Sequence, residues 1–315
     1  YYKRRFNVDL DPENEVIVTL GSKEGLANLA QAITSPGDII LSPNPSYPIH
    51  PYGFIIAGAS LRHLPAMNEG IFNPELYLER LENSIKDSVP APVALIVSFP
   101  SNPTAQVVSL EFYEELVKIA LKYNVYILSD LAYAEIYYDN VKPPSILEVS
   151  RAKEVAVEFT SMSKTYAMAG WRIGFAVGNI KLINALTRIK SYLDYGAFTP
   201  VQVAAAAALN GPQNCVEEIR NIYQKRRDIL ITSMARSGWD IPKPQASMFA
   251  WAPLPEKYKS KGSLEFAKEL MLKADVAVAP GVAFGEYGEG YVRVGLVENE
   301  QRIRQAAKNI KKLLQ

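Results

Sequence analysis

A lysine and an arginine eight residues apart form the most informative segment of the chain. Lys164 lies in the run TSMSKT just after an expected strand, and Arg172 lies between Gly170 and Gly174. Glycine lets backbone approach a ligand closely, and the planar fork of arginine suits phosphate. A positive neighbour also keeps part of a lysine amine neutral and therefore nucleophilic. Alone, Lys164 would indicate a surface loop, but with Arg172 the segment indicates a phosphate site beside a reactive lysine.

An acidic residue follows another expected strand. Asp130 and Tyr133 lie in the run SDLAY, directly after Val125–Leu128. A carboxylate at this place is often a helix N-cap. The alternative is a carboxylate that pairs with a pyridinium nitrogen and keeps the ring protonated, so that the ring can withdraw electrons from a carbanion. Tyr133 would then hydrogen-bond the phenolic oxygen of the same ring.

Two further turns follow expected strands. Asn102 lies in the run FPSNPT after Val93–Val97, where prolines shape a turn. Its amide could donate to the same phenolic oxygen. Tyr47 lies in the run NPSYP after Ile39–Leu41 and could either pack in the turn or stack on an aromatic cofactor.

Two weaker signals complete the candidate site. Ser22 and Lys23 lie in the run GSKEG between a strand and a helix, where backbone N–H groups form an anion site or an ordinary cap. The run matches neither the G-x-G-x-x-G nor the P-loop pattern. Arg293 stands among apolar residues in the run YVRVG. It could face solvent or bind a substrate carboxylate with both arms of its fork.

Short apolar runs alternate with helical patterns through the first two thirds of the chain. Helices are expected over Ser22–Thr34 and Ser109–Tyr123, where apolar residues recur on one face. Strands separated by helices predict an α/β fold with a mostly parallel central sheet covered by helices. Ligands of such sheets bind beyond the carboxyl ends of the strands, which is where the candidate residues stand. The strands expected in this part are Val16–Leu20, Ile39–Leu41, Val93–Val97, Val125–Leu128, Val155–Phe159 and Gly174–Val177.

The last third of the chain has a different rhythm. A helix after Gly211 is expected to run to Arg236, long enough to leave one domain and enter another. Beyond it, three expected strands and a closing helix over Glu300–Leu314 predict a smaller C-terminal α+β domain. We place the large domain at residues 1–215 and the small domain at residues 216–315. The three strands are Ser247–Trp251, Val276–Ala279 and Tyr291–Val294.

Composition excludes several classes of protein. The 34 Lys and Arg nearly balance the 33 Asp and Glu, which leaves no basic footprint for nucleic acid or a membrane surface. No apolar run approaches the roughly 20 residues of a transmembrane helix. A single cysteine, Cys215, cannot form an internal disulfide, which suits a reducing cytoplasm. Two histidines are too few for a His-rich metal site.

The start of the chain resembles the end of a basic helix that is already in progress, and it has no initiator Met. We therefore expect the natural protein to have residues upstream of Tyr1. A removed signal peptide is the competing explanation.

Together these runs resemble the fold-type-I pyridoxal-phosphate enzymes, specifically the class I/II aminotransferases. The order GSKEGL, FPSNPTAQ, SDLAY, SMSK with GWRIG, and YVRVG carries the resemblance from Gly21 to Leu296. Within the family the chain is most similar to bacterial glutamate–pyruvate (alanine) aminotransferases, and next to LL-diaminopimelate and aspartate aminotransferases. Ala105 stands where most of these enzymes carry glycine, but the alanine subgroup shares the Thr-Ala-Gln run seen here.

The resemblance implies a cofactor, pyridoxal 5′-phosphate, and a role for each candidate. Lys164 would carry the cofactor as a Schiff base and act in catalysis with Asp130 and Tyr133. The other cofactor contacts would be Ser22, Lys23, Ser161 and Arg172 at the phosphate, Tyr47 at the ring, and Asn102 at the phenolic oxygen. Arg293 and Asn102 would bind the substrate.

The resemblance also implies how the enzyme works and assembles. We expect a ping-pong transfer of an amino group between amino acids and 2-keto acids, preferably alanine and 2-oxoglutarate, by a homodimer. The family's N-terminal segment, which covers the active site and reaches across the dimer, has no counterpart in this sequence.

Two rivals stay open. A carbon–sulfur lyase on the same fold would keep every cofactor residue and differ only in its products. A ligand-sensing domain of a transcription regulator would carry its DNA-binding module upstream. The neutral net charge and the complete set of proton-transfer residues argue against the regulator.

Overall fold

The structure is a computed structural model that describes residues 1–67 and 70–314. Seven strands form its large sheet, in the order β1-β7-β6-β5-β4-β2-β3. Neighbours from β3 to β6 are parallel, whereas β7 is antiparallel to both β6 and β1. The predicted α/β fold with a mostly parallel sheet is therefore confirmed. The strands are β1 (Val16–Thr19), β2 (Ile39–Asn44), β3 (Ser60–Pro65), β4 (Ala94–Val97), β5 (Tyr126–Asp130), β6 (Ala156–Ser161) and β7 (Gly174–Gly178).

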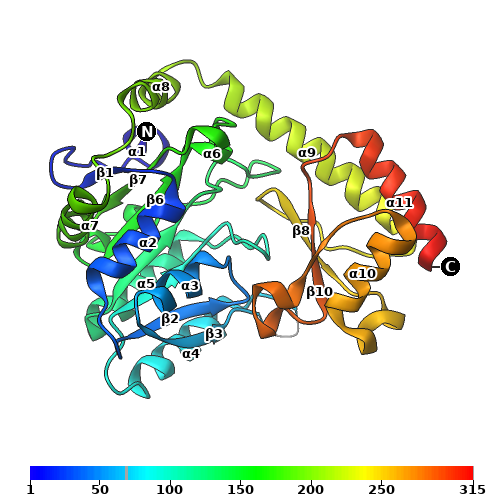
Figure 1. The fold of residues 1–315 in the computed structure, drawn as a ribbon, viewed down its shortest axis with the longest axis horizontal. Coiled ribbons are helices and arrows are strands. Elements are labelled where there is room, and N and C mark those ends of the chain that lie inside the picture. Colours follow the sequence, from blue (N-terminus) through cyan, green and yellow to red (C-terminus); the bar gives the residue numbers. More distant parts are fainter. Residues whose placement is uncertain (68–69, 315) are drawn as a thin grey trace.

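Helices cover both faces of the large sheet (Figure 1). One face packs against α1 (Tyr2–Phe6), α4 (Pro74–Lys86) and α5 (Leu110–Tyr123). The other packs against α2 (Ser22–Ile33), α3 (Ile49–Ile56) and α7 (Ile180–Leu193). Successive side chains of a strand point to opposite faces, so each buried strand feeds both cores. In β2, for example, Leu41 lies in the first core and Ile40 in the second.

A second, smaller sheet is built from the last third of the chain. It has the order β8-β10-β9, and both of its pairings are antiparallel. The helix α9 leads to it from α8 and runs diagonally across the top of the view (Figure 1). Helices α9, α10 and α11 pack on this sheet around what we call the C-terminal core. The elements are α8 (Thr199–Asn210), α9 (Asn214–Ala235), β8 (Phe249–Pro253), α10 (Gly262–Ala274), β9 (Ala279–Pro280), β10 (Tyr291–Gly295) and α11 (Glu300–Leu314).

One expected strand, Val276–Ala279, is mostly wrong. Only Ala279 enters β9. Asp275 takes a left-handed conformation that ends α10, and the Val276 N–H then donates to the Leu270 carbonyl. The Val276 N–H therefore bonds to the end of α10 and is not free to pair with a neighbouring strand. The run with β-branched residues connects α10 to β9.

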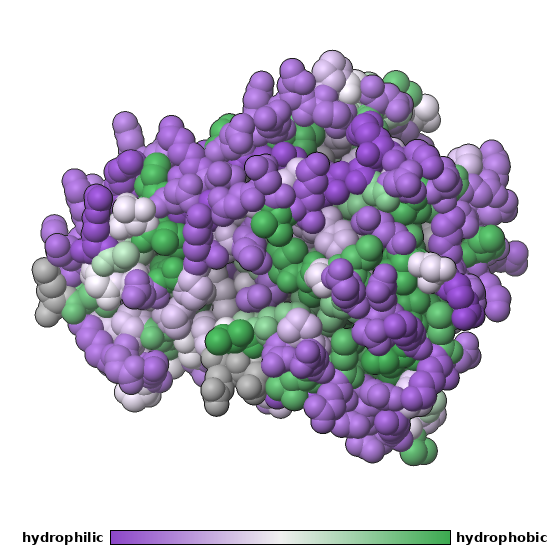
Figure 2. Space-filling model, turned by 180° about the vertical axis from the view of Figure 1, so that it is seen from behind, coloured by the Kyte–Doolittle hydropathy of each residue, from purple (hydrophilic) through white to green (hydrophobic). Residues whose placement is uncertain are grey.

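The C-terminal core also takes two residues from the first half of the chain. Ile136 and Tyr138, in the loop after β5, are buried among the side chains of α9, β8 and β10. The outer surface, seen from behind, is mostly hydrophilic with patches of hydrophobic side chains (Figure 2). Among the described residues, no helix is long and apolar enough to cross a bilayer.

Candidate active site

All ten candidate residues line one cavity of about 310 Å³. The cavity lies between the carboxyl ends of the parallel strands and the strands β8 and β10 of the small sheet. The sequence did not single out Ala132, Ser163, Ala169 and Phe249, which also line it. The ten are Ser22, Lys23, Tyr47, Asn102, Asp130, Tyr133, Ser161, Lys164, Arg172 and Arg293.

The sheet explains why these residues converge. Asp130 and Ser161 are the last residues of two adjacent parallel strands, β5 and β6. Lys164 follows in α6 (Met162–Thr165), one turn beyond Ser161. Arg172 comes from the start of the antiparallel return to β7, where its φ of 50° places a non-glycine residue in the left-handed region. Such a conformation costs energy and is typical of functional sites.

Asp130 is paired on one side only. Its carboxylate is 6% exposed, and Oδ2 lies 3.0 Å from Nε2 of the buried His50. Its other oxygen, Oδ1, is buried without a hydrogen-bond partner among the described residues. A buried carboxylate oxygen that lacks a partner is costly, so Asp130 presents an unmet acceptor beside the cavity. Sequence reasoning missed His50, although it lies on the first turn of α3, three residues after Tyr47.

Arg293 bridges the two sheets. It lies in β10, and its Nη1 donates to Oδ1 of Asn102, at the end of the large sheet, over 2.7 Å. The guanidinium also lies 4.2 Å from the ring centre of Phe249 and 4.6 Å from that of Phe284. Burial lowers the pKa of Arg293, but the group stays charged because guanidinium pKa values are so high.

Two other groups have pKa values set by burial. Burial, followed by the charge of Asp130, raises the pKa of the Tyr133 hydroxyl, which therefore remains protonated and able to donate. Burial lowers the pKa of the Lys164 amine, and the positive charges of Arg172 and Arg293 lower it further. A lowered pKa leaves a larger share of the amine neutral near neutral pH, as a nucleophile or proton acceptor requires.

An anion cup lies at the start of α2. The first-turn N–H groups of a helix lack intrahelical partners, and the N-cap Gly21 has no side chain to occupy them. Arg172 reaches this place, where its Nη2 donates to the Leu20 carbonyl over 3.2 Å. A Cβ on Gly21 would collide with that guanidinium, and the φ of 86° also requires glycine. Ser22, Arg172 and the helix start together form a positive concavity.

A buried lysine supports the cup from behind. Lys190 of α7 is 4% exposed, and its Nζ lies 2.8 Å from both Glu24 and Asp194. The other oxygen of Glu24 accepts the Leu20 N–H, and that of Asp194 accepts the Gly196 N–H. We call these three side chains the Lys190 link. It joins the cup to a segment with exposed aromatic side chains, here named the aromatic edge: Tyr192, Tyr195 and Phe198.

Comparison with known proteins identifies the family of the chain. The family model for aminotransferase class I and II matches residues 1–310. The chain is 58% identical to AatC of Rhizobium meliloti, provisionally assigned as an aminotransferase, over the whole chain and 76% of that protein. It is 54% identical to the glutamate–pyruvate aminotransferase AlaC of Escherichia coli, over 99% of the chain and 74% of that protein. An aromatic aminotransferase structure from Pyrococcus horikoshii superposes with a TM-score of 0.92 at 28% identity, covering 99% of this chain and 83% of that one.

The chain therefore belongs to the aminotransferase class I and II family and is a transaminase. The resemblance of the sequence runs to this family is confirmed. The family implies pyridoxal phosphate as cofactor.

The residues of the cavity fit that group at each of its polar ends. The anion cup suits the phosphate, and the unpartnered Oδ1 of Asp130 suits a protonated ring nitrogen. Tyr133 and Asn102 offer hydrogen bonds to a phenolic oxygen, and the partly neutral Lys164 suits an aldehyde. The fit rests on charge and hydrogen-bond type, and the complementary groups come from the start of α2, from the loops after β4 and β5, and from α6.

Proposed function

We propose that this enzyme transfers the amino group between L-alanine and 2-oxoglutarate. The observation that carries the proposal is the meeting of Lys164, Asp130 and Arg293 in one cavity. The preference for alanine is supported by 54% identity to a glutamate–pyruvate aminotransferase, against 45% to the LL-diaminopimelate aminotransferase of Aquifex aeolicus.

In this proposal each end of the cavity has one task. Bound pyridoxal phosphate supplies an aldehyde that links amines and a ring that withdraws electrons from the α carbon. The Lys164 Nζ would accept the α-proton of the substrate and later return it, because burial leaves part of this amine neutral and the residue lines the cavity. Asp130 holds the proton on the ring nitrogen, and His50 fixes the orientation of Asp130. Tyr133, Asn102 and Tyr47 hold the ring, and Ser22, Lys23, Ser161 and Arg172 hold the phosphate.

Arg293 orients the substrate by its α-carboxylate. The guanidinium already accommodates one acceptor, the Oδ1 of Asn102, and a carboxylate would engage its remaining N–H groups. Asn102 would therefore steer Arg293 and border the substrate at the same time. Exclusion of water by Phe249 and Phe284 strengthens this ion pair.

We further propose that the enzyme is a homodimer in the cytoplasm. The aromatic edge supports the dimer, because the three side chains are 74%, 106% and 73% exposed and large exposed aromatic side chains are typical of interfaces. Two units, residues 1–215 and 216–315, fit the separate cores, although Ile136 and Tyr138 of the first span pack in the C-terminal core.

The decisive experiment is a half-reaction screen. The holoenzyme is mixed with single amino acids, and loss of the absorbance of the lysine-linked cofactor is followed. Alanine and glutamate are expected to react fastest. If LL-diaminopimelate reacts faster than alanine, LL-diaminopimelate is the preferred substrate. Release of pyruvate and ammonia from a cysteine conjugate would indicate a lyase.

Arg293→Lys is expected to raise the KM for both alanine and 2-oxoglutarate by roughly one to two orders of magnitude. A point charge cannot replace a bidentate fork, and charge-assisted hydrogen bonds of this kind are worth about 1.5–3 kcal/mol. Steady-state kinetics with either substrate varied measures the effect, and Lys181→Arg on the exposed face of α7 serves as the control. An unchanged KM would show that another residue holds the carboxylate.

A further inference from the structure

The segment that follows Tyr133 joins the two parts of the molecule. Its residues 136–138 run beside residues 245–247, just before β8. The Tyr138 N–H donates to the Gln245 carbonyl over 2.9 Å, and the Ser247 N–H donates to the Ile136 carbonyl over 2.7 Å. This joint, as we call it, lies three residues from Tyr133 and two from Phe249. One strand of the joint leads back along the chain to Tyr133 and the other leads on to Phe249. These two segments are the arms of the joint, and both Tyr133 and Phe249 line the active-site cavity.

Arg227 of α9 ties this joint to the long helix. Its side chain is fully buried, and its two terminal nitrogens donate to the two oxygens of Asp139 over 2.8 and 3.0 Å. It also donates to the Pro244 carbonyl over 3.3 Å and lies 4.6 Å from the ring centre of Tyr138. Arg227 thus contacts the chain directly after one strand of the joint and directly before the other.

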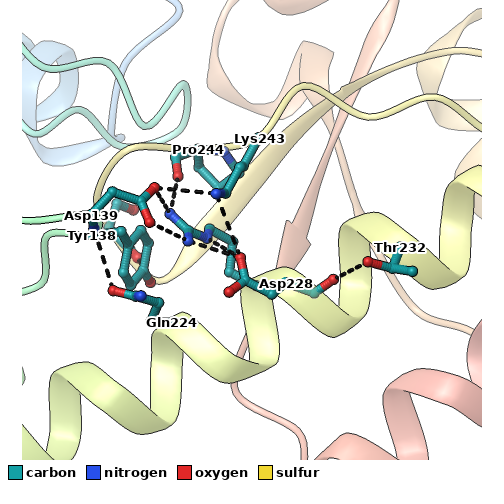
Figure 3. Close-up of polar contacts among 9 residues, drawn as sticks. Tyr138, Asp139, Gln224, Asp228, Thr232, Lys243 and Pro244 are labelled. Carbon is teal, nitrogen blue, oxygen red and sulfur yellow. Dashed lines mark hydrogen bonds and ion pairs between the residues drawn. The ribbon is translucent and has the colours of Figure 1, made fainter.

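The charges around Arg227 fall into a local pair and a long-range pair. Asp228 is the next residue on the same helix, whereas Asp139 is 88 residues away along the chain. Lys243 lies near both carboxylates, and the amide oxygen of Gln224 accepts the Asp139 N–H (Figure 3). Asp139 has a φ of 54°, in a left-handed turn that aspartate tolerates. Of the two carboxylates that Arg227 contacts, only Asp139 lies in the loop that carries Tyr133. Helix α9 reaches the same loop through Gln224 and, one turn earlier, through Arg220, which bonds Glu135.

We propose that Arg227 is a positioning residue for substrate binding. Through Asp139 and Pro244 it sets the two arms of the joint relative to each other, and so fixes Phe249 and Arg293 against Tyr133 and Asn102. The rings of Tyr133 and Phe249 meet edge to face at 5.7 Å, and Arg293 packs on Phe249 while it bonds Asn102. These contacts connect the two sheets, so they depend on the relative position in which the joint holds its two arms.

The inference rests on the proposed role of Arg293, and it makes a selective claim. The anion cup is built from α2, β6 and the turn before β7, all within the large sheet and its helices. Loss of the Arg227–Asp139 bond is therefore expected to weaken the grip on a substrate carboxylate far more than the binding of the cofactor, whose phosphate contacts lie outside the joint. A residue that only stabilised the fold would affect both or neither.

The test compares two variants, each of which removes the negative charge of one carboxylate partner of Arg227. Asp139→Asn breaks the long-range pair, and Asp228→Asn breaks the local one; the two side chains are 48% and 49% exposed. The probe is 2-methylalanine, which lacks an α-proton and so can bind without completing the reaction. Its dissociation constant is measured from the absorbance of the bound cofactor, and the affinity for pyridoxal phosphate is measured separately on the apoenzyme.

Asp139→Asn is expected to weaken 2-methylalanine binding about tenfold, since a misplacement of about 1 Å at a site can cost up to a hundredfold. Pyridoxal phosphate affinity should stay within about twofold. Asp228→Asn should change neither. Equal weakening in both variants, or none in Asp139→Asn, would overturn the inference.

A second variant tests the same joint without altering charge. Tyr138→Phe keeps the ring in the C-terminal core and removes only the hydroxyl that donates to the Ser247 carbonyl. It is expected to weaken 2-methylalanine binding several-fold in the same selective way, and unchanged binding would count against the joint. If instead the parent binds no 2-methylalanine and reacts with no amino acid, the proposed function fails, which is a distinguishable result.

Discussion

Replacing Lys164 by alanine is expected to abolish covalent attachment of the cofactor and to lower transamination by at least about a thousandfold, the range that general base catalysis and proximity contribute. Among the residues that line the cavity, only Lys23 offers a second amine, and it lies at the anion cup, on the first turn of α2. Reduction with borohydride followed by peptide mass spectrometry measures the attachment directly.

The control for this variant is Lys181→Ala, which removes an exposed lysine from α7. It should keep both the modified peptide around Lys164 and the parent rate. If the Lys164 variant still traps the cofactor at another lysine, or still turns over alanine at a sizeable fraction of the parent rate, the assignment of Lys164 is wrong.

Asp130→Asn is expected to retain the cofactor but to lose roughly two to four orders of magnitude in the alanine half-reaction. A neutral amide cannot hold a proton on the ring nitrogen, and removal of one partner from a buried charge pair costs about 3–5 kcal/mol. Exchange of the α-hydrogen of alanine with deuterium, followed by NMR, isolates this step from later ones.

Glu135→Gln is the matched control, because Glu135 is also 6% exposed and also a buried acid of the same loop. Its carboxylate pairs with Arg5 and Arg220 outside the cavity. The substitution should lower thermal stability and leave the exchange rate within a few-fold. Normal exchange in Asp130→Asn would remove Asp130 from the reaction.

The sequence was sufficient to bring the ten candidates together because parallel strands impose a rule. Carboxyl ends of adjacent parallel strands meet at one edge, so residues that follow strands, such as Asn102 and Asp130, become neighbours without any knowledge of packing. Arg293 was harder to place from this rule, since it lies within β10 of the other sheet. Its position followed from the resemblance and from its charge among apolar residues.

The residues that the sequence did not reveal act through partners far away in the chain. His50 matters because of Asp130, 80 residues later, and Arg227 because of Asp139, 88 residues earlier. Neither distance leaves a periodic signal. The run Val276–Ala279 misled for a related reason, since β-branched residues favour strands only where a partner strand accepts their N–H groups.

The Lys190 link has a thermodynamic consequence. An anion in the cup and a surface packed on the aromatic edge would order the same three side chains, Glu24, Lys190 and Asp194. Coupling free energy between two sites is reciprocal, so whatever tightens one tightens the other by the same factor. In the proposed homodimer, separation of the subunits would then weaken cofactor binding, and release of the cofactor would weaken the dimer. The affinity for the cofactor would therefore depend on protein concentration.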